Sequence, residues 1–417
     1  MRPPKFSLKY FSLFMILPFT MLCLTQPLRV AGQIKNLSKL PNLSQDVEKA
    51  KKYPSIPMPD SYPKDLVQLF DEQVNARSYV VVDSQTSRIL AQRQSNVPYP
   101  IASMSKIIPT YLVFKAIDEG KLTLETEIEA PKEITDVLSN NYELSSANLI
   151  GGQKYSVKDL LYGVIMMSGN DATSVLMWHL YGSEQGGVEA IKDQLDEWGI
   201  TDYRFFTNSG LPNSFLPEEW WAPGSSANDE NQMSAQDVAL VAQHVSEDYP
   251  EILQIASTIE YRFKADTEFE QVFYATNLLL TGQSEERQGI TGLKSGSTDA
   301  AGNNFVATGT EEGRELVTVA MGVFPNADGS VTTPYADINH LLNGLATHPD
   351  LYQDEKLPTN KKPSLAERQA EEASIQASIN ESIVEAAKKD ETPGEEVKEF
   401  ENRRDNPITD FLGQFFK

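Results

Sequence analysis

Patterns typical of β-strands occur at both ends of the central part of the chain, and helical patterns fill the region between them. Residues 78–92 combine two β-rich runs around a turn, and residues 303–324 repeat that order with a glycine-containing turn. Between these hairpins, residues 156–167 and 186–200 carry apolar residues at helical spacing. This arrangement predicts an α+β layer fold with an antiparallel sheet.

Charge and residue content exclude several kinds of partner and site. The 417-residue chain has a formal net charge of −23, and phosphate binding requires clustered Lys and Arg, so we expect no nucleic-acid partner. The single cysteine, Cys23, lies in an apolar N-terminal segment. No metal-ligand spacing is formed by the four histidines, His179, His244, His340 and His348. No phosphate-binding glycine loop is visible either, and we expect neither a metal nor a cofactor.

The first 32 residues have the pattern of a signal peptide. A basic front precedes an apolar stretch at residues 10–24, which is too short for a comfortable membrane span. An uncleaved N-terminal anchor is the alternative. Residues 33–63 are polar and contain several prolines, as expected for a linker. We therefore expect the protein to be exported.

Residues 101–114 form an apolar run of helical character with a serine and a lysine near its start. Ser103 and Lys106 lie three positions apart, which places them on one face of a helix. Free N–H groups at a helix start favour a developing oxyanion, and a desolvated lysine can serve as a base. The pattern alone is weak, because an N-cap serine followed by a surface lysine has the same spacing. Pro109 would remove one helix hydrogen bond within the run.

Two further polar clusters interrupt the apolar patterns downstream. Residues 168–170, Ser-Gly-Asn, separate two apolar helices, and residues 294–297, Lys-Ser-Gly-Ser, directly precede a strand pattern. Taken singly, the first is consistent with an ordinary turn and the second with a loop that leads into a strand. Together with Ser103 and Lys106, they complete S-x-x-K, S-x-N and K-[ST]-G in the order typical of penicillin-recognising serine enzymes.

The sequence around these motifs resembles one family among the penicillin-recognising serine enzymes. Four segments resemble the low-molecular-mass penicillin-binding proteins of the serine-type D-alanyl-D-alanine carboxypeptidase family: residues 79–107, 144–172, 205–212 and 292–309. The resemblance covers roughly residues 64–345 and implies a penicillin-binding serine peptidase domain over residues 64–350. It also implies a fold of the β-lactamase/transpeptidase type, with helices packed on both faces of the antiparallel sheet and an all-helical subregion.

The resemblance implies three catalytic side chains. Ser103 would be the acylated nucleophile, Lys106 its general base, and Ser168 the relay that passes a proton towards the leaving amine. The backbone N–H groups of Ser103 and Ser297 would form the oxyanion hole, and losing one such donor typically costs about 10²–10³ in rate.

The resemblance also implies the substrate contacts. Asn170 would hydrogen-bond the substrate peptide, Lys294 would supply positive charge, and Ser295 would bind the terminal carboxylate. Gly296 would let the substrate backbone approach the strand edge. Position 295 is Ser where the family usually has Thr; because the hydroxyl is kept, we expect altered affinity rather than lost activity.

The implied substrate is a peptidoglycan stem peptide that ends in D-Ala-D-Ala, and β-lactams would be covalent inhibitors. D,D-transpeptidation differs only in the acyl acceptor and stays open as an alternative. A β-lactamase on the same scaffold is disfavoured, because no E-x-x-x-N element follows the second motif. A catalytically silent wall-binding module, or a scaffold that acts through an acidic C-terminal part, would be a function of another class.

The C-terminal part departs from the family, which often continues into a small β-rich domain. Residues 351–405 are charged and poor in aromatic residues, which predicts an acidic helical or disordered stalk. Apolar residues then repeat on one helical face within residues 406–417: Ile408, Phe411, Leu412, Phe415 and Phe416. This pattern fits an interfacial helix, and the resemblance implies an amphipathic anchor on the outer face of the cytoplasmic membrane, in the cell wall space. A frayed tail or a helix docked on the body are the alternatives.

A second departure is the length of the irregular loop at residues 214–231. It contains Trp220 and Trp221, for which two interpretations are open. The tryptophans either roof the substrate cleft or serve as packing residues.

Overall fold

The computed structural model describes residues 62–326 and 329–390, which belong to two compact units. The first unit extends to Leu365, and the second begins at Ala366. The segments expected to be a signal peptide and a membrane anchor, residues 1–32 and 406–417, lie outside the described residues, as does nearly all of the expected linker.

A five-stranded antiparallel sheet organises the first unit, with the strand order β2-β1-β11-β10-β9. Its strands are β1 (Ser78–Asp83), β2 (Arg88–Arg93), β9 (Ile290–Thr298), β10 (Gly302–Glu311) and β11 (Arg314–Val323). The two hairpins expected from the sequence meet where β1 pairs with β11, and Val80 lies opposite Val319. The predicted antiparallel sheet is confirmed, and its order places β9 at one edge.

Most helices follow one another between β2 and β9. The helices of the first unit are α3 (Lys64–Gln73), α4 (Ile107–Asp118), α5 (Lys132–Leu138), α6 (Val157–Met166), α7 (Asn170–Tyr181), α8 (Glu184–Glu197), α9 (Ala235–Asp248), α10 (Glu251–Ala256) and α11 (Pro334–Ala346). As the capping pattern predicts, the Ser156 side chain accepts a hydrogen bond from the N–H of Asp159 at 3.0 Å. Gly199, with φ of +77°, ends α8 in the left-handed conformation that glycine adopts at low cost.

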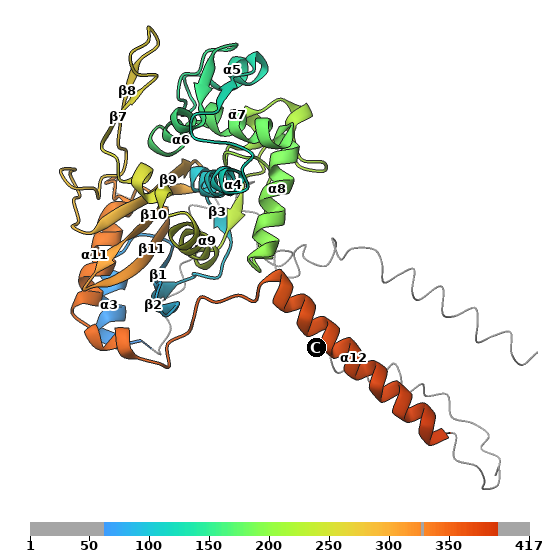
Figure 1. Cartoon of the computed structure of the whole chain (residues 1–417). Helices are drawn as coiled ribbons and strands as arrows, with labels where there is room; N and C mark the ends of the chain where they lie inside the picture. Colours follow the sequence, from blue (N-terminus) through green and yellow to red (C-terminus); the bar gives the residue numbers. More distant parts are fainter. Residues whose placement is uncertain (1–61, 327–328, 391–417) are drawn as a thin grey trace, which may run out of the picture. The chain divides into compact units, whose positions relative to one another are not determined.

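Helices cover both faces of the sheet, as the fold prediction requires (Figure 1). On one face, Tyr79 and Val81 of β1 belong to a hydrophobic core shared with α3 and α11. On the other face, Val80 and Val82 belong to a larger core that contains α4, α6, α7, α8 and α9. Successive side chains of a strand point to opposite faces, so a continuously buried strand such as β1 fits a sheet that is covered on both sides.

Short elements complete the first unit. Three two-stranded ladders pair β3 (Tyr99–Pro100) with β6 (Gln232–Met233), β4 (Glu127–Glu129) with β5 (Lys154–Ser156), and β7 (Glu260–Phe263) with β8 (Gln271–Tyr274). The 3₁₀-helices are η3 (Ala102–Lys106), η4 (Asn213–Phe215), η5 (Glu218–Trp220) and η6 (Pro349–Gln353).

The long loop at residues 214–231 packs into the body. Trp220 is 4% exposed, and its ring centroid lies 4.8 Å from that of Trp178 on α7 in an edge-to-face arrangement. The indole N–H of Trp221 donates to the carbonyl of Leu216 at 3.0 Å. Of the two interpretations, the structure supports packing residues.

The boundary expected at residue 351 lies too early in the chain, because residues 351–363 pack on the first unit. We call these residues the C-terminal strap. Leu351, Tyr352 and Leu357 are buried, and the N–H of Ile89 on β2 donates to the carbonyl of Pro358 at 2.8 Å. The strap needs only a few apolar residues to stay attached to the first unit, because it also forms hydrogen bonds along the edge of the sheet. The composition of residues 351–363 therefore does not indicate that they belong to the first unit.

The described part of the second unit is a single helix. α12 (Leu365–Asp390) begins at the end of the first unit, and its described side chains are almost all exposed. Its helical form agrees with one of the two forms expected for the stalk. Within the described ranges, no helix has the length and apolar content needed to cross a membrane.

The strap gives a testable difference between two truncations. Removing residues 366–417 is expected to leave the melting temperature of the first unit unchanged. Removing residues 349–417 deletes the buried side chains of Leu351, Tyr352 and Leu357 and exposes the surface that they cover. Each such side chain stabilises the fold by about 1.5–3 kcal/mol when buried, so the melting temperature is expected to fall by at least about 5 °C. Near-ultraviolet circular dichroism would measure both. Equal melting temperatures would contradict the structural role of the strap.

Candidate active site

Ser103 lies in a 3₁₀ turn rather than on the first turn of an α-helix. Ala102, at the start of η3, has φ of +48°, a left-handed conformation that is strained for a residue with a side chain. The turn is held from inside by the Ser105 hydroxyl, which donates to the carbonyl of Ala102 at 2.7 Å. The α-helix begins only at Ile107, so Pro109 falls in its first turn, where a missing N–H costs nothing.

Lys106 meets Ser103 inside the protein. Its Nζ donates to the Ser103 Oγ at 2.7 Å and to the carbonyl of Ser209 at 2.8 Å, and the side chain is completely buried. Burial, and secondly the positive charge of Lys294, lower the pKa of Lys106 well below the ordinary lysine value. Asp171 and Glu184 act in the opposite direction. A lysine in this state is suited to accept a proton from the hydroxyl beside it.

The Ser209 carbonyl was not singled out from the sequence, although the segment that contains it contributed to the family resemblance. Buried Glu184, at the start of α8, holds this loop by accepting the N–H of Asn208 at 2.7 Å. Gly210 has φ of +84°, and a Cβ there would collide with the carbonyl of Ala102. An Asn-Ser-Gly turn after a strand-like segment is the signal that could have pointed to this contact.

The second motif joins the third through a hydrogen bond. Ser168 sits between α6 and α7 with φ of +55°, and its Oγ accepts from the Nζ of Lys294 at 3.0 Å. Asn170 begins α7, and its side-chain N–H donates to the carbonyl of Ser145 at 2.9 Å. The Asn170 Oδ1 is buried and has no protein partner. It is therefore an acceptor left for another group.

Asp171 organises the loop that orients Asn170. This carboxylate is fully buried and accepts five hydrogen bonds. Two come from the hydroxyls of Ser139 and Ser146, and three come from the main-chain N–H groups of Ala147, Leu149 and Ala172. Residues 139–149 are thereby fixed beside the second motif, and Ser145 lies within them. Sequence analysis did not identify Asp171, because its partners are up to 32 positions away.

The third motif lies on the edge strand β9. Lys294 is buried, and burial lowers its pKa to about 7. A Cβ on Gly296 would lie 3.0 Å from the backbone N of Ser103, so only glycine allows β9 to approach the nucleophile turn this closely. The neighbouring Ser297 is exposed. Burial raises the pKa of Tyr335 to about 12, and a hydrogen bond with Ser295 opposes that shift.

All eight residues selected from the sequence lie on three neighbouring segments: η3, the α6–α7 turn with the first residue of α7, and β9. Two contacts bind them into pairs, Ser103 with Lys106 and Ser168 with Lys294. Asn170 and Gly296 flank these pairs from α7 and β9. The arrangement provides a nucleophile, an adjacent amine, a hydroxyl relay and a cation in one place.

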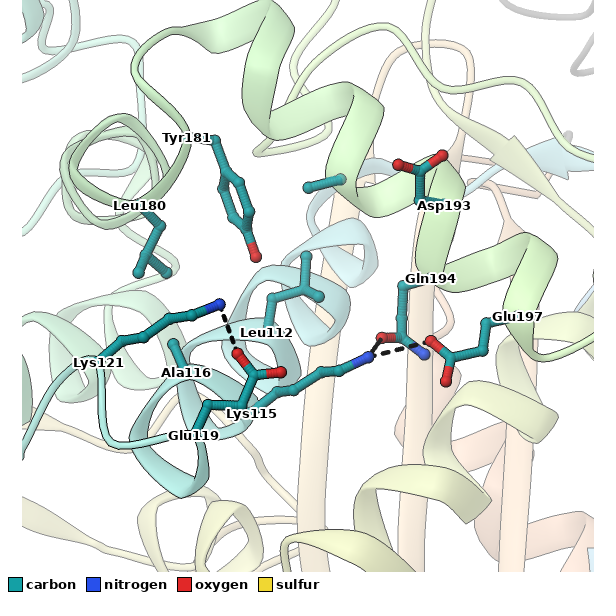
Figure 2. A pocket seen from close by; sticks show the side chains of 11 residues that line it. Leu112, Lys115, Ala116, Glu119, Lys121, Leu180, Tyr181, Asp193, Gln194 and Glu197 are labelled. Atoms are coloured by element: carbon teal, nitrogen blue, oxygen red, sulfur yellow. Dashed lines mark hydrogen bonds and ion pairs between the residues drawn. The ribbon is translucent and has the colours of Figure 1, made fainter. Parts of the chain in front are cut away.

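One cavity of the first unit lies away from the motif residues. It measures about 220 Å³ and lies between α4, the end of α7 and α8 (Figure 2). Its two lysines already contact acidic or amide groups of the same cavity, since Lys115 donates to Gln194 and Glu197, and Lys121 pairs with Glu119. It contains none of the motif residues, and we place the chemistry at the motifs on geometric grounds. Within the described part of the chain, no three His, Cys, Asp or Glu side chains gather as metal ligands.

Comparison with known sequences gives one family. The sequence model of the D-alanyl-D-alanine carboxypeptidase family matches residues 65–325. Among curated relatives, the chain is 31% identical over 255 residues to a D-alanyl-D-alanine carboxypeptidase DacA of Haemophilus influenzae, covering 60% of this chain and 58% of the relative. It is 27% identical over 252 residues to DacC of Escherichia coli, covering 60% and 57%. The match thus spans less than two thirds of the length of these relatives.

Solved structures agree with this result. The chain is similar to a peptidoglycan synthesis regulatory factor (PBP3) from Streptococcus pneumoniae, at 30% identity and a TM-score of 0.59, over 67% of this chain and 72% of the other. It is also similar to penicillin-binding protein 5 from Haemophilus influenzae, at 28% identity and a TM-score of 0.54, over 66% and 72%. The predicted fold type is confirmed. Because the family match covers more than half of the chain and includes all three motifs, the chain belongs to the D-alanyl-D-alanine carboxypeptidase family.

Proposed function

We propose that this protein is a serine D,D-carboxypeptidase that removes the terminal D-alanine from peptidoglycan stem pentapeptides through an acyl-enzyme on Ser103. The observation that carries the proposal is the 2.7 Å contact between the amine of fully buried Lys106 and the hydroxyl of Ser103, which is itself only partly buried. Family membership gives independent support. The presence of every reactive side chain argues against a catalytically silent wall-binding module.

Acylation begins with proton transfer from Ser103 to the neutral amine of Lys106. The Ser103 Oγ attacks the carbonyl carbon of the scissile D-Ala-D-Ala bond, and the oxygen of that carbonyl becomes an oxyanion. The N–H groups of Ser103 and Ser297 receive this charge. Support comes from the close approach of β9 to the nucleophile turn at Gly296.

Collapse of the tetrahedral intermediate breaks the peptide bond. Ser168 passes its proton to the leaving amine and takes in its place the proton that Lys106 received from Ser103, so Lys106 is neutral again. Lys294, whose Nζ lies 3.0 Å from the Ser168 Oγ, orients that hydroxyl. D-Alanine then leaves, and the shortened peptide stays as an ester on Ser103. Attack by water on this ester releases the peptide and restores the serine.

Substrate binding uses the remaining motif residues. The free Oδ1 of Asn170 would accept a hydrogen bond from the substrate peptide. The Lys294 ammonium and the Ser295 hydroxyl would receive the terminal carboxylate, and Gly296 would let the peptide lie along β9. The same cleft would accept a β-lactam as a covalent inhibitor.

The first prediction concerns Ser103. Benzylpenicillin added to the protein without residues 1–32 is expected to give one persistent adduct per molecule, because slow deacylation traps the ester. Intact mass measured over time would detect it, and Ser103→Ala is expected to give none. D-Alanine release from a model peptide would then follow. An unmodified protein with intact drug would refute the proposal, and an unmodified protein with hydrolysed drug would indicate a β-lactamase.

The second prediction concerns pH. Since the pKa of Lys294 is about 7, its positive charge is present below that pH and lost above it. If this charge receives the carboxylate, its loss is expected to slow acylation as pH rises through about 7, relative to a variant whose charge at this position does not titrate. Lys294→Arg keeps its charge at every accessible pH and is expected to remove this alkaline fall. The measurement is the acylation rate constant against pH, and an unchanged fall in the variant would contradict the role of Lys294.

We also propose that the protein is exported and works at the outer face of the cytoplasmic membrane, held there by residues 406–417. The support is sequence pattern: the basic front and apolar stretch of residues 1–32, and the apolar helical face near the C-terminus.

The third prediction tests this anchor. Protein without residues 1–32 is expected to float with lipid vesicles in a density gradient, because its apolar helical face enters the interface. A matched protein that also lacks residues 406–417 is expected to stay unbound. Equal flotation of both proteins would remove the anchor from the proposal.

A further inference from the structure

A buried carboxyl holds the end of β9. Glu230 is 4% exposed, and its Oε2 accepts a hydrogen bond from the hydroxyl of Thr298 at 2.6 Å. The same hydroxyl accepts the N–H of Ala301 at 3.0 Å and so fixes the turn into β10. Thr298 directly follows Ser297, whose N–H is the proposed second donor of the oxyanion hole. The Glu230 carboxyl therefore acts one residue away from that donor.

The next residue holds the other half of the site. Asn231 is completely buried, and its side-chain N–H donates to the Ser105 Oγ at 3.0 Å. Its carbonyl accepts the N–H of Ile101 at 3.0 Å. Ile101 and Ser105 stand on either side of Ser103 in the nucleophile turn. Residues 230 and 231 thus connect the two segments that carry the oxyanion-hole donors.

We propose that Glu230 is a titratable positioning residue for acylation. Its carboxylate accepts a hydrogen bond from the Thr298 hydroxyl and so holds the N–H of Ser297 where it and the N–H of Ser103 can donate to the same oxyanion. This inference rests on the proposed function and concerns the same site. A protonated carboxyl is a weaker acceptor than a carboxylate, and its own O–H can turn to another partner. Protonation therefore loosens the end of β9 from the loop that carries Asn231.

The surroundings of Glu230 put this change in an accessible pH range. Burial raises the pKa of Glu230 to about 7; the hydrogen bond from Thr298 opposes the shift, and the charge of Asp299 adds to it. Charged residues on the neighbouring segments are Asp229 on the same loop, Arg204, whose main chain pairs with Gln232, Lys294 on β9 and Lys106 in the nucleophile turn; Glu218 and Glu219 lie further back on the loop. Above about pH 7 the Glu230 carboxylate and its hydrogen bond from Thr298 are present, and both are lost as pH falls below that value.

The test compares acylation of the wild-type protein and Glu230→Gln by benzylpenicillin across pH, measured by rapid quench and intact mass. Glutamine keeps an acceptor oxygen but does not titrate. Between about pH 8 and about pH 6 the wild-type rate constant is expected to fall roughly tenfold more than that of the variant, since a misplaced oxyanion donor slows acylation. Protonation of Lys106 slows both proteins equally, so the difference isolates Glu230. A variant with the wild-type acid fall would overturn the inference.

Two further variants keep the result interpretable. Thr298→Val nearly keeps the side-chain shape but removes both the hydrogen bond donated to Glu230 and the one accepted from Ala301, and it is expected to acylate roughly tenfold more slowly at high pH. A wild-type rate and pH profile in Thr298→Val would also overturn the inference, even if Glu230→Gln did not fold. Glu247→Gln, at a carboxyl near the end of α9 whose pKa burial also raises, is the matched control and is expected to keep the wild-type profile.

The outcomes separate this inference from the proposed function. If the wild-type protein forms no adduct at any pH, the proposed function fails and the inference fails with it. If the wild-type protein forms the adduct and Glu230→Gln keeps the same acid fall, only the inference fails.

Discussion

Two lysine side chains are buried within one site, and the remainder of the site is arranged around them. Removing an ammonium group from water costs several kcal/mol, and two such groups close together also repel each other. The lowered pKa values of Lys106 and Lys294 are the consequence. Each amine is surrounded by neutral oxygen acceptors, a hydroxyl and a backbone carbonyl. An amine in such surroundings can be neutral near physiological pH, which a base beside a serine requires.

The fold keeps these two amines in place by close contacts between segments far apart in sequence. Glycine permits the approach of β9 and of the Asn208–Gly210 turn to the nucleophile turn, where any Cβ would collide with backbone atoms. Ala102 and Ser168 adopt left-handed conformations that cost about 1–3 kcal/mol each and persist only where packing fixes them. Buried Asp171 and Glu184 fix the loops beside these two residues through main-chain hydrogen bonds from Ala147, Leu149 and Asn208. The core on both faces of the sheet thus supports a strained site at one sheet edge.

The sequence was sufficient for the features that depend on local patterns. Alternation and turn residues predicted both hairpins, and Ser156 and Asp159 predicted the start of α6. The spacing of Ser103 and Lys106 placed them on one face, but only the three motifs together, through the family resemblance, implied that they act as a pair. The missed features depend on contacts between distant residues. The carbonyl of Ser209, the five donors to Asp171 and the carboxyl of Glu230 have no local periodicity. The strap was missed because it is polar in composition and buries only a few side chains.

The strap has a consequence for association between protein chains. An unpaired strand at the edge of a sheet is a template for aggregation and for addition of foreign peptides, because its N–H and C=O groups are free to bond. Backbone hydrogen bonds from Ile89 to Pro358 and from Asn360 to Ser87 occupy the β2 edge. The opposite edge is β9, beside Ser103. An extended peptide that joins this sheet by β-augmentation is therefore directed to the β9 edge beside the nucleophile rather than to the start of β2, which the strap covers.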